Sequence, residues 1–276
     1  MPIHRTINLR TITDEEFEII DAAVMRCAYE VQNEFGRLFD ERVYENALAA
    51  KLRQEGFEVH TQVPVKLSHG SFAKSYFLDL VVNDMIYELK VVHELAAEHE
   101  AQALHYAMLQ KVRHTKLLNF GGPRVQGKVK YNVIDETTRY QPMLRKTGWQ
   151  IRTPQCEKLI NHFRALLADW GTHLSCQLYN EALVHHCGGE EHCLARVELS
   201  AGPLNLGSHL VQLHAPNHAF TLTCMTSNQD AYQQHLETLL KHAQLEAIQW
   251  INLNHSRVEI TTLDQNSNGT GTGARE

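Results

Sequence analysis

The feature that most constrains the fold of this 276-residue chain is an internal repeat. Residues 36–48 align with residues 171–183 at a constant offset of 135, and both segments carry Gly, Tyr, Ala and Leu at matching positions. Between residues 79 and 120 the offset is 133 without a gap, which aligns Leu80 with Leu213 and Asn119 with Asn252. A repeat of this kind predicts two domains of one topology, and chance similarity between two mixed α/β halves is the alternative.

Hydrophobic spacing in the first half predicts helices and strands in a definite order. Thr13 and Glu16 have the spacing of a capping box, and apolar residues then recur at helical spacing up to Gly36. Short runs of β-branched and aromatic residues between turn-forming residues predict strands. The expected helices cover residues 14–35, 42–54 and 94–112, and the expected strands cover 59–66, 75–82, 85–92, 116–120 and 128–134.

The same patterns predict where the domains begin and end. Residues 136–152 are polar without a clear period, which is typical of a linker, and a new helical stripe follows Thr153 and Pro154. Residues 264–276 contain no core-forming side chain and are expected to be disordered. We therefore expect a first domain over residues 1–135 and a second over residues 153–263.

Composition places the chain in a broad class. It has 43% hydrophobic and 21% charged residues, no apolar run approaching ~18 residues and no secretory hydrophobic stretch in its first ten residues. These features favour a cytoplasmic protein, in which the six cysteines are expected to stay reduced. The net charge of −6 argues against a strongly basic nucleic-acid binder.

Charge is unevenly distributed, however. Residues 111–146 hold nine basic side chains and only two acids, Asp135 and Glu136. This stretch could contact phosphates, and a solvated basic face is the alternative.

The most informative short motif is Glu88-Leu89-Lys90. Residues two apart on a strand share a face, so Glu88 and Lys90 project together while Leu89 points the other way. Asp79 lies near the end of the preceding expected strand and reaches the same place if the two strands form a hairpin. Two carboxylates suit Mg²⁺ or Mn²⁺, although strand ends also display such residues without any site.

The surroundings of this triplet resemble the GxxExxY protein family, a branch of the PD-(D/E)XK nuclease-like superfamily. The resemblance covers about residues 15–135, and the Gly turn departs from the family because Arg37-Leu38-Phe39-Asp40 follows Gly36. The matching segments, in family order, are Glu41-Arg-Val-Tyr44, Gln62-Val-Pro-Val65, Leu78-Asp-Leu-Val81, Glu88-Leu-Lys90, Glu100-Ala-Gln102 and Leu118-Asn-Phe120.

The resemblance implies an α-β-β-β-α-β restriction-endonuclease-like core with a metal-dependent nuclease site. Asp79 and Glu88 would bind the divalent cation, and Glu41 would contribute through the metal or its waters. Lys90 would orient the nucleophilic water or offset charge on the phosphorane. Gln102 and Tyr106, which share a helix face, would contact the site or the nucleic-acid backbone. For Glu41, Gln102 and Tyr106, ordinary surface or core packing is the alternative.

The repeat predicts that only one copy keeps this chemistry. At the same offsets Tyr44 recurs as Tyr179, which indicates a packing role, whereas the acidic and basic positions are lost. Glu41, Asp79, Glu88, Lys90, Gln102 and Tyr106 fall on Cys176, Gln212, Thr221, Thr223, His235 and Leu239. The second domain is therefore expected to be a degenerate nuclease-like copy that replaces the partner of a homodimer or binds another molecule. The oligomeric state stays open.

A second cluster of potential ligands lies between His185 and Cys193. Its His and Cys residues could bind zinc, but they lack the regular spacing of structural zinc sites and align with a helix end and turn of the first copy. No Walker A loop, dinucleotide-binding turn or nucleophile elbow is present.

Two functions remain in competition. The first is a Mg²⁺- or Mn²⁺-dependent phosphodiesterase that cleaves DNA, or alternatively RNA, with the basic stretch facing the strand. The second is a nucleic-acid-binding or protein-interaction module that retains a nuclease scaffold without turnover.

Overall fold

A computed structural model describes residues 2–265 of the chain. The chain divides into two compact units, Met1–Ile134 and Asp135–Glu276. Both are mixed α/β structures built on a six-stranded sheet, which confirms the predicted fold class. Each unit is described by itself.

The helices of the first unit begin and end where local chemistry requires. α1 (Asp14–Phe35) opens with the expected capping box, in which the Thr13 hydroxyl accepts from the Glu16 N–H at 3.2 Å. The helix ends at Gly36, whose φ of 72° is a conformation that other residues rarely adopt. α2 (Glu41–Gln54) begins one residue before the predicted start and packs against α1.

Six strands form the sheet of the first unit. β3 pairs antiparallel with β2 and β4, and α3 (Ala97–Gln110) makes the crossover that brings β5 parallel to β4. The order across the sheet is β1 (Ile3–Arg5), β2 (Val59–His69), β3 (Phe72–Val82), β4 (Met85–Lys90), β5 (His114–Asn119) and β6 (Gln126–Tyr131).

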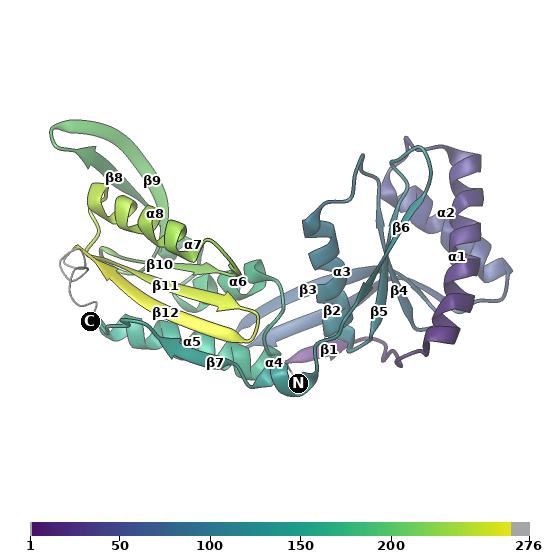
Figure 1. The fold of residues 1–276 in the computed structure, drawn as a ribbon, viewed down its shortest axis with the longest axis horizontal. Helices are drawn as coiled ribbons and strands as arrows, with labels where there is room; N and C mark the ends of the chain where they lie inside the picture. The colour runs from purple at the N-terminus through teal and green to yellow at the C-terminus, as the bar shows by residue number, and fades with distance from the viewer. Residues whose placement is uncertain (1, 266–276) are drawn as a thin grey trace, which may run out of the picture. The chain divides into compact units, whose positions relative to one another are not determined.

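This sheet lies between two helical layers, with α1 and α2 on one face and α3 on the other (Figure 1). Leu80, Tyr87 and Leu89 are fully buried in the core beneath α1 and α2. Because side chains alternate along a strand, Asp79 and Glu88 project from the opposite face, on the side of α3. The alternation of side chains along β3 and β4 thus places the hydrophobic core on one face of the sheet and the expected site on the other.

The second unit has its own sheet, between α5 and α6 on one face and α8 on the other (Figure 1). Its helices are α4 (Glu136–Tyr140), α5 (Pro154–Trp170), α6 (Cys176–His186), α7 (Glu190–Cys193) and α8 (Gln229–His242). Across the sheet the order is β7 (Met143–Lys146), β12 (Arg257–Asp264), β11 (Ala247–Asn254), β10 (His218–Thr223), β9 (Leu204–Ala215) and β8 (Leu194–Ala201).

Five strands have the same order and directions in both sheets. β2 to β6 correspond to β8 to β12, and each set contains one parallel pair after the crossover helix. The register of that pair is also shared, since Lys90 lies opposite Asn119 and Thr223 lies opposite Asn252. The sixth strand differs, because β1 extends the sheet beside β2 whereas β7 extends it beside β12.

A buried asparagine closes the end of the parallel pair in each unit. The Asn119 side chain accepts from the N–H of Val92 at 3.0 Å and donates to its carbonyl at 2.9 Å. Asn252 makes the same two bonds with Met225, at 2.8 and 3.1 Å. Both residue pairs are related by the offset of 133, so the aligned residues make equivalent contacts.

The prediction of an unstructured linker over residues 136–152 is wrong. This stretch contains α4 and β7, and β7 pairs with β12 over Met143–Lys146. The pairing partner lies more than 100 residues later, which local sequence patterns do not detect. In the expected disordered tail, Asp264 ends β12, and residues 266–276 lie outside the described residues.

No helix among the described residues is long and apolar enough to span a membrane.

Candidate active site

Asp79 is held at the point where β3 and β4 separate. Backbone pairing between the two strands extends only to Leu80 and Tyr87. Beyond it the Asp79 Oδ2 accepts a hydrogen bond from the Leu89 N–H at 2.9 Å. The carboxylate thus satisfies a buried backbone donor and is fixed beside Glu88.

Glu88 and Lys90 project to the same side, as the strand period predicts. The Lys90 Nζ lies 2.6 Å from the Glu88 Oε1, and the Glu88 side chain is only 1% exposed. Burial raises the pKa of Glu88 to about 8, and the nearby charge of Asp79 adds to this effect. The Glu88 Oε2 is buried without a hydrogen-bond partner. A buried carboxylate oxygen in this state favours a proton or a cation.

Lys90 keeps its charge in this environment. Burial lowers its pKa, but the carboxylates of Glu88 and Glu41 raise it, and the net shift is upward. The site therefore holds the Lys90 ammonium beside the carboxyl groups of Glu88 and Glu41.

Glu41, the first residue of α2, belongs to the same electrostatic group. Burial raises its pKa, the charge of Lys90 opposes this shift, and the charge of Asp79 reinforces it. The charges of Lys90 and Asp79 thus act on the Glu41 carboxyl, and its part in the site stays a prediction.

Two further polar side chains contact the group: Glu45, which no sequence motif indicated, and Gln62, the first residue of the Gln62-Val-Pro-Val65 segment. Glu45 is 2% exposed and lies 2.9 Å from Arg42, while the Gln62 amide donates to Glu45 at 2.6 Å and to Asp79 at 3.3 Å. Gln62 has a φ of 51°, which non-glycine residues adopt rarely. Glu45 could have been found from sequence, because it lies one helical turn after Glu41 on the same face.

Gln102 and Tyr106 share a face of α3. The Gln102 amide donates to the Tyr106 hydroxyl at 3.0 Å, and Tyr106 is 5% exposed. Burial raises the pKa of Tyr106, and the charge of Glu88 is the next largest cause. Tyr106 therefore lies near the acidic group and stays protonated, so its hydroxyl remains a hydrogen-bond donor.

Tyr44 lies apart from these carboxylates, in the core. Its ring is fully buried and stacks on Phe120 at 4.6 Å between centroids. The hydroxyl donates to the Gly36 carbonyl at 2.9 Å and accepts from the Phe39 N–H at 3.3 Å. Tyr44 thus supports the turn that precedes Glu41.

A divalent cation fits this group of residues as an open site. Among residues 2–265 no three His, Cys, Asp or Glu side chains are arranged to hold a metal. Mg²⁺, however, is usually bound by one or two carboxylates, with waters and substrate phosphates as its other ligands. Asp79 and Glu88 supply those carboxylates, and the unpartnered Glu88 Oε2 is the oxygen that such an ion would satisfy.

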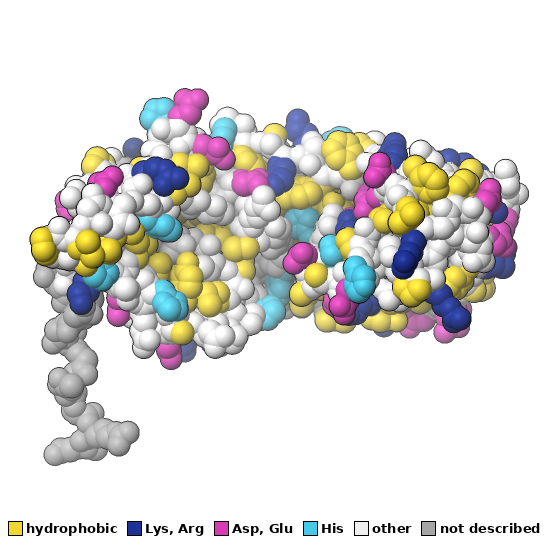
Figure 2. Space-filling model, turned by 90° about the horizontal axis from the view of Figure 1, so that it is seen from above, with side chains coloured by type: hydrophobic (Ala, Val, Ile, Leu, Met, Phe, Trp, Pro, Cys, Tyr) yellow, Lys and Arg dark blue, Asp and Glu magenta, His cyan; other side chains and the backbone are white. Residues whose placement is uncertain are grey.

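Part of the basic stretch has structural partners. Lys116 is buried and pairs with Asp21 at 2.6 Å, and Lys130 pairs with Glu100 at 2.8 Å. Arg139 is 2% exposed and donates to the Trp170 carbonyl at 2.7 Å within the second unit. Figure 2 likewise shows basic side chains interspersed with acidic ones on the face in view. Three of the nine basic residues therefore have structural roles, and the other six are exposed.

The second unit offers a different set of surface features. The His185–Cys193 cluster spans the end of α6, a Gly turn and α7, and no three-ligand metal group occurs there or elsewhere in the described residues.

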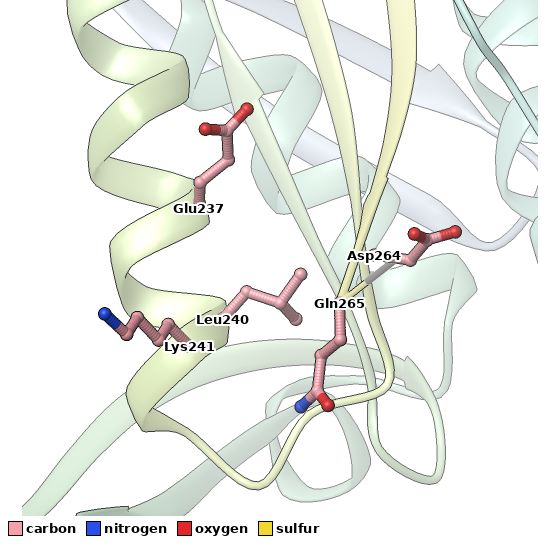
Figure 3. Close-up of a pocket in the computed structure, with 5 residues that line it drawn as sticks. All are labelled: Glu237, Leu240, Lys241, Asp264 and Gln265. Carbon is pink, nitrogen blue, oxygen red and sulfur yellow. The ribbon is translucent and has the colours of Figure 1, made fainter. Parts of the chain in front are cut away.

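A pocket of about 200 Å³ lies between α8 and the end of β12 (Figure 3). It is lined by Glu237, Leu240, Lys241, Asp264 and Gln265, none of which is an expected site residue.

Comparison with known proteins supports the assignment of the first unit. Residues 18–131 match a family model described as the PD-(D/E)XK nuclease superfamily. A solved structure titled "Crystal structure of SSO0001" is 18% identical and covers 42% of this chain and 68% of that chain. Its TM-score of 0.24 adds nothing to the fold assignment. The search of curated proteins gave no significant match.

Proposed function

We propose that the first unit, a domain of the PD-(D/E)XK nuclease superfamily, hydrolyses phosphodiester bonds of DNA, or alternatively RNA, at a single metal-dependent site. One observation carries the proposal. The buried carboxylates of Asp79 and Glu88 lie together on one face of the sheet, with the Lys90 ammonium 2.6 Å from Glu88. Burying a carboxylate and an ammonium costs free energy unless both are fully hydrogen-bonded. Such a pair in the interior therefore often takes part in binding or catalysis.

Each residue has a separate task in this proposal. Asp79 and Glu88 would hold Mg²⁺ or Mn²⁺, and Glu41 would bind a water of that ion. When bound, such an ion lowers the pKa of its water and offsets charge on the scissile phosphate. Lys90, relieved of its contact with Glu88, would hydrogen-bond the attacking water or a phosphate oxygen. Gln62 keeps Asp79 oriented, and Tyr106 presents a neutral hydroxyl toward the group.

For the second unit we propose a degenerate copy of the same fold without this chemistry. The shared strand order, the shared register and the equivalent Asn119 and Asn252 contacts support a duplication. Thr221 and Thr223 stand where the first unit has Glu88 and Lys90. A neutral hydroxyl at Thr221 cannot replace the Glu88 carboxylate toward a hard cation, and Thr223 lacks the positive charge of Lys90.

The competing function is a binding module without turnover. It is favoured by the net charge of −6 and by the Lys90 contact, which neutralises Glu88 without a metal. A chelator distinguishes the two functions. It should abolish cleavage, which needs a metal-activated water, and it should leave the binding by a module without turnover unchanged.

The test is incubation of the full chain with end-labelled single- and double-stranded DNA and RNA, with Mn²⁺ and with a chelator in parallel. Cleavage that requires Mn²⁺ and is lost in Asp79→Ala supports the nuclease. Binding without cleavage at any metal concentration supports the module.

A further inference from the structure

We infer that the loop Arg37–Phe39, between α1 and α2, contacts unpaired bases of the substrate, so that the proposed nuclease acts on single-stranded DNA regions. This inference rests on the proposed function and names its substrate class. The loop exposes an unusual set of side chains. Leu38 is 92% exposed and Phe39 is 49% exposed, and Arg37 beside them is also on the surface.

The loop lies next to the acidic group. Phe39 is two residues before Glu41, so their Cα atoms are at most about 7.6 Å apart. The helix that begins at Glu41 also reaches Asp79 through Glu45, which accepts from the Gln62 amide at 2.6 Å while that amide donates to Asp79 at 3.3 Å. A strand whose phosphate reaches these residues therefore passes the exposed loop.

The exposure of Leu38 is not a result of fraying. The Tyr44 hydroxyl binds both sides of the loop, at the Gly36 carbonyl and at the Phe39 N–H. Its ring is itself fixed in the core against Phe120. The loop is thus anchored on both sides. It presents Leu38 to solvent, whereas the half-exposed Phe39 ring packs edge-on against Phe35 at 6.3 Å between centroids.

The second unit supplies an internal comparison for this loop. The Tyr179 hydroxyl donates to the Gly171 carbonyl at 2.6 Å and accepts from the Leu174 N–H at 3.4 Å, which are the equivalent bonds at an offset of 135. Between these anchors the loops diverge, because His173 has a φ of 66°.

Side-chain burial differs accordingly. Thr172 is fully buried and Leu174 is 6% exposed, whereas their counterparts Arg37 and Phe39 are on the surface. In the second unit Arg139 of α4 covers this loop, because its carbonyl accepts from the Thr172 N–H at 2.9 Å and its side chain donates to the Thr172 carbonyl at 3.2 Å. In the first unit the matching side chains of Arg37 and Phe39 stay on the surface.

Unpaired bases are the occupant that this chemistry fits best. Aromatic side chains stack on exposed base faces, and the effect is large enough to change affinity several-fold for each base. Paired bases inside a duplex have both faces covered by their neighbours. Leucine and phenylalanine give little affinity for the phosphate backbone, which is bound mainly by charged and hydrogen-bonding groups. Arg37 can add a phosphate contact or stack on a base.

The experiment measures binding separately from cleavage. Fluorescence anisotropy with Asp79→Asn protein, in chelator, gives the dissociation constants for a 20-nucleotide single strand, its duplex and the matching RNA. We expect tighter binding of the single-stranded DNA than of the duplex. Leu38→Ser/Phe39→Ser should weaken single-strand binding at least about fivefold and leave duplex binding unchanged. The matched control is Ile19→Ser, which truncates a 70% exposed side chain of α1.

Each outcome decides the inference. Equal affinity for single strand and duplex, no binding of single-stranded DNA, tighter binding of RNA, or an unchanged constant in the double variant overturns it. If Leu38→Ser/Phe39→Ser loses its cooperative urea transition, Leu38→Ser alone replaces it, because that side chain touches little of the fold. Wild-type protein that binds as expected but never cleaves refutes the proposed nuclease activity and leaves the base contact standing.

Discussion

The Asp79 Oδ2 accepts a hydrogen bond from the Leu89 N–H at 2.9 Å. The contact ties Asp79, which we propose to bind the metal, to the strand that carries Glu88 and Lys90. It should therefore affect both folding and catalysis. Substitutions at Asp79 can separate the two.

We expect Asp79→Asn and Asp79→Ala to differ in stability but not in activity. Asparagine keeps an oxygen that accepts from Leu89, whereas alanine leaves a buried donor unpaired at a cost of about 1–3 kcal/mol. Both variants lose the charge, so both should cleave DNA at least ~100-fold more slowly with Mn²⁺. Urea unfolding and initial cleavage rates measure the two effects. Gln212→Ala, at the aligned position of the second unit, is the control and should retain the wild-type rate.

Lys90 is expected to act on the reaction and not on ion binding. Lys90→Ala removes the ammonium that lies 2.6 Å from Glu88, so Mn²⁺ should bind at least as tightly as in wild type while cleavage falls ~100-fold or more. Cleavage rates at saturating Mn²⁺ separate these quantities. Weaker Mn²⁺ binding with a normal rate at saturation would mean that Lys90 only positions Glu88. The control is Lys74→Ala, a change of another lysine of the first unit on β3.

The raised pKa of Glu88 predicts a pH dependence of folding. Its pKa is about 8 in the folded chain and about 4.5 when unfolded, so between these values the folded state holds more protons. The stability contributed by protonated Glu88 is therefore complete below about pH 4.5 and is lost as the pH rises toward 8. We expect Glu88→Gln to stabilise the metal-free chain more at pH 8 than at pH 5, measured by urea unfolding. Equal effects at both pH values contradict this explanation.

The same pKa predicts that cation binding releases a proton. A metal needs the ionised carboxylate, so below pH 8 it must displace the proton of Glu88. Mn²⁺ affinity should rise with pH up to about 8 and then level off. The number of protons released, from calorimetry in buffers of different ionisation enthalpy, checks the mechanism.

Tyr44 and Tyr179 should behave alike, because each hydroxyl closes the turn before a helix of its unit. Removing the hydroxyl in Tyr44→Phe or Tyr179→Phe should cost about 1–3 kcal/mol of unfolding free energy. Tyr44→Phe should also slow cleavage through the loop that it supports, whereas Tyr179→Phe should not. Urea unfolding of both variants with cleavage rates tests the pair. A loss of cleavage in Tyr44→Phe without any loss of stability would place its hydroxyl in the site instead.

Much of the first unit could be predicted from sequence because the relevant signals are local. The Thr13 capping box and Gly36 define α1 to the residue, and the period of two around Leu89 places Glu88 and Lys90 on one face. These patterns depend only on neighbours along the chain.

Other features depend on contacts between distant segments and could not be predicted in this way. β7 exists because residues 143–146 pair with β12, and nothing in the stretch itself indicates a strand. Lys116 lies in the stretch that could contact phosphates, but the structure pairs it with Asp21 on α1. Gln62 has a positive φ and joins Glu45 to Asp79, and sequence patterns reveal neither its backbone conformation nor these contacts.

The most direct test of the central claim is a calorimetric titration of the full chain with Mn²⁺. A single site in the first unit predicts one ion per chain, retained in Gln212→Ala/Thr221→Ala and absent in Asp79→Ala/Glu88→Ala. Binding that persists in Asp79→Ala/Glu88→Ala, or is absent from the wild-type chain with and without DNA, would contradict the account.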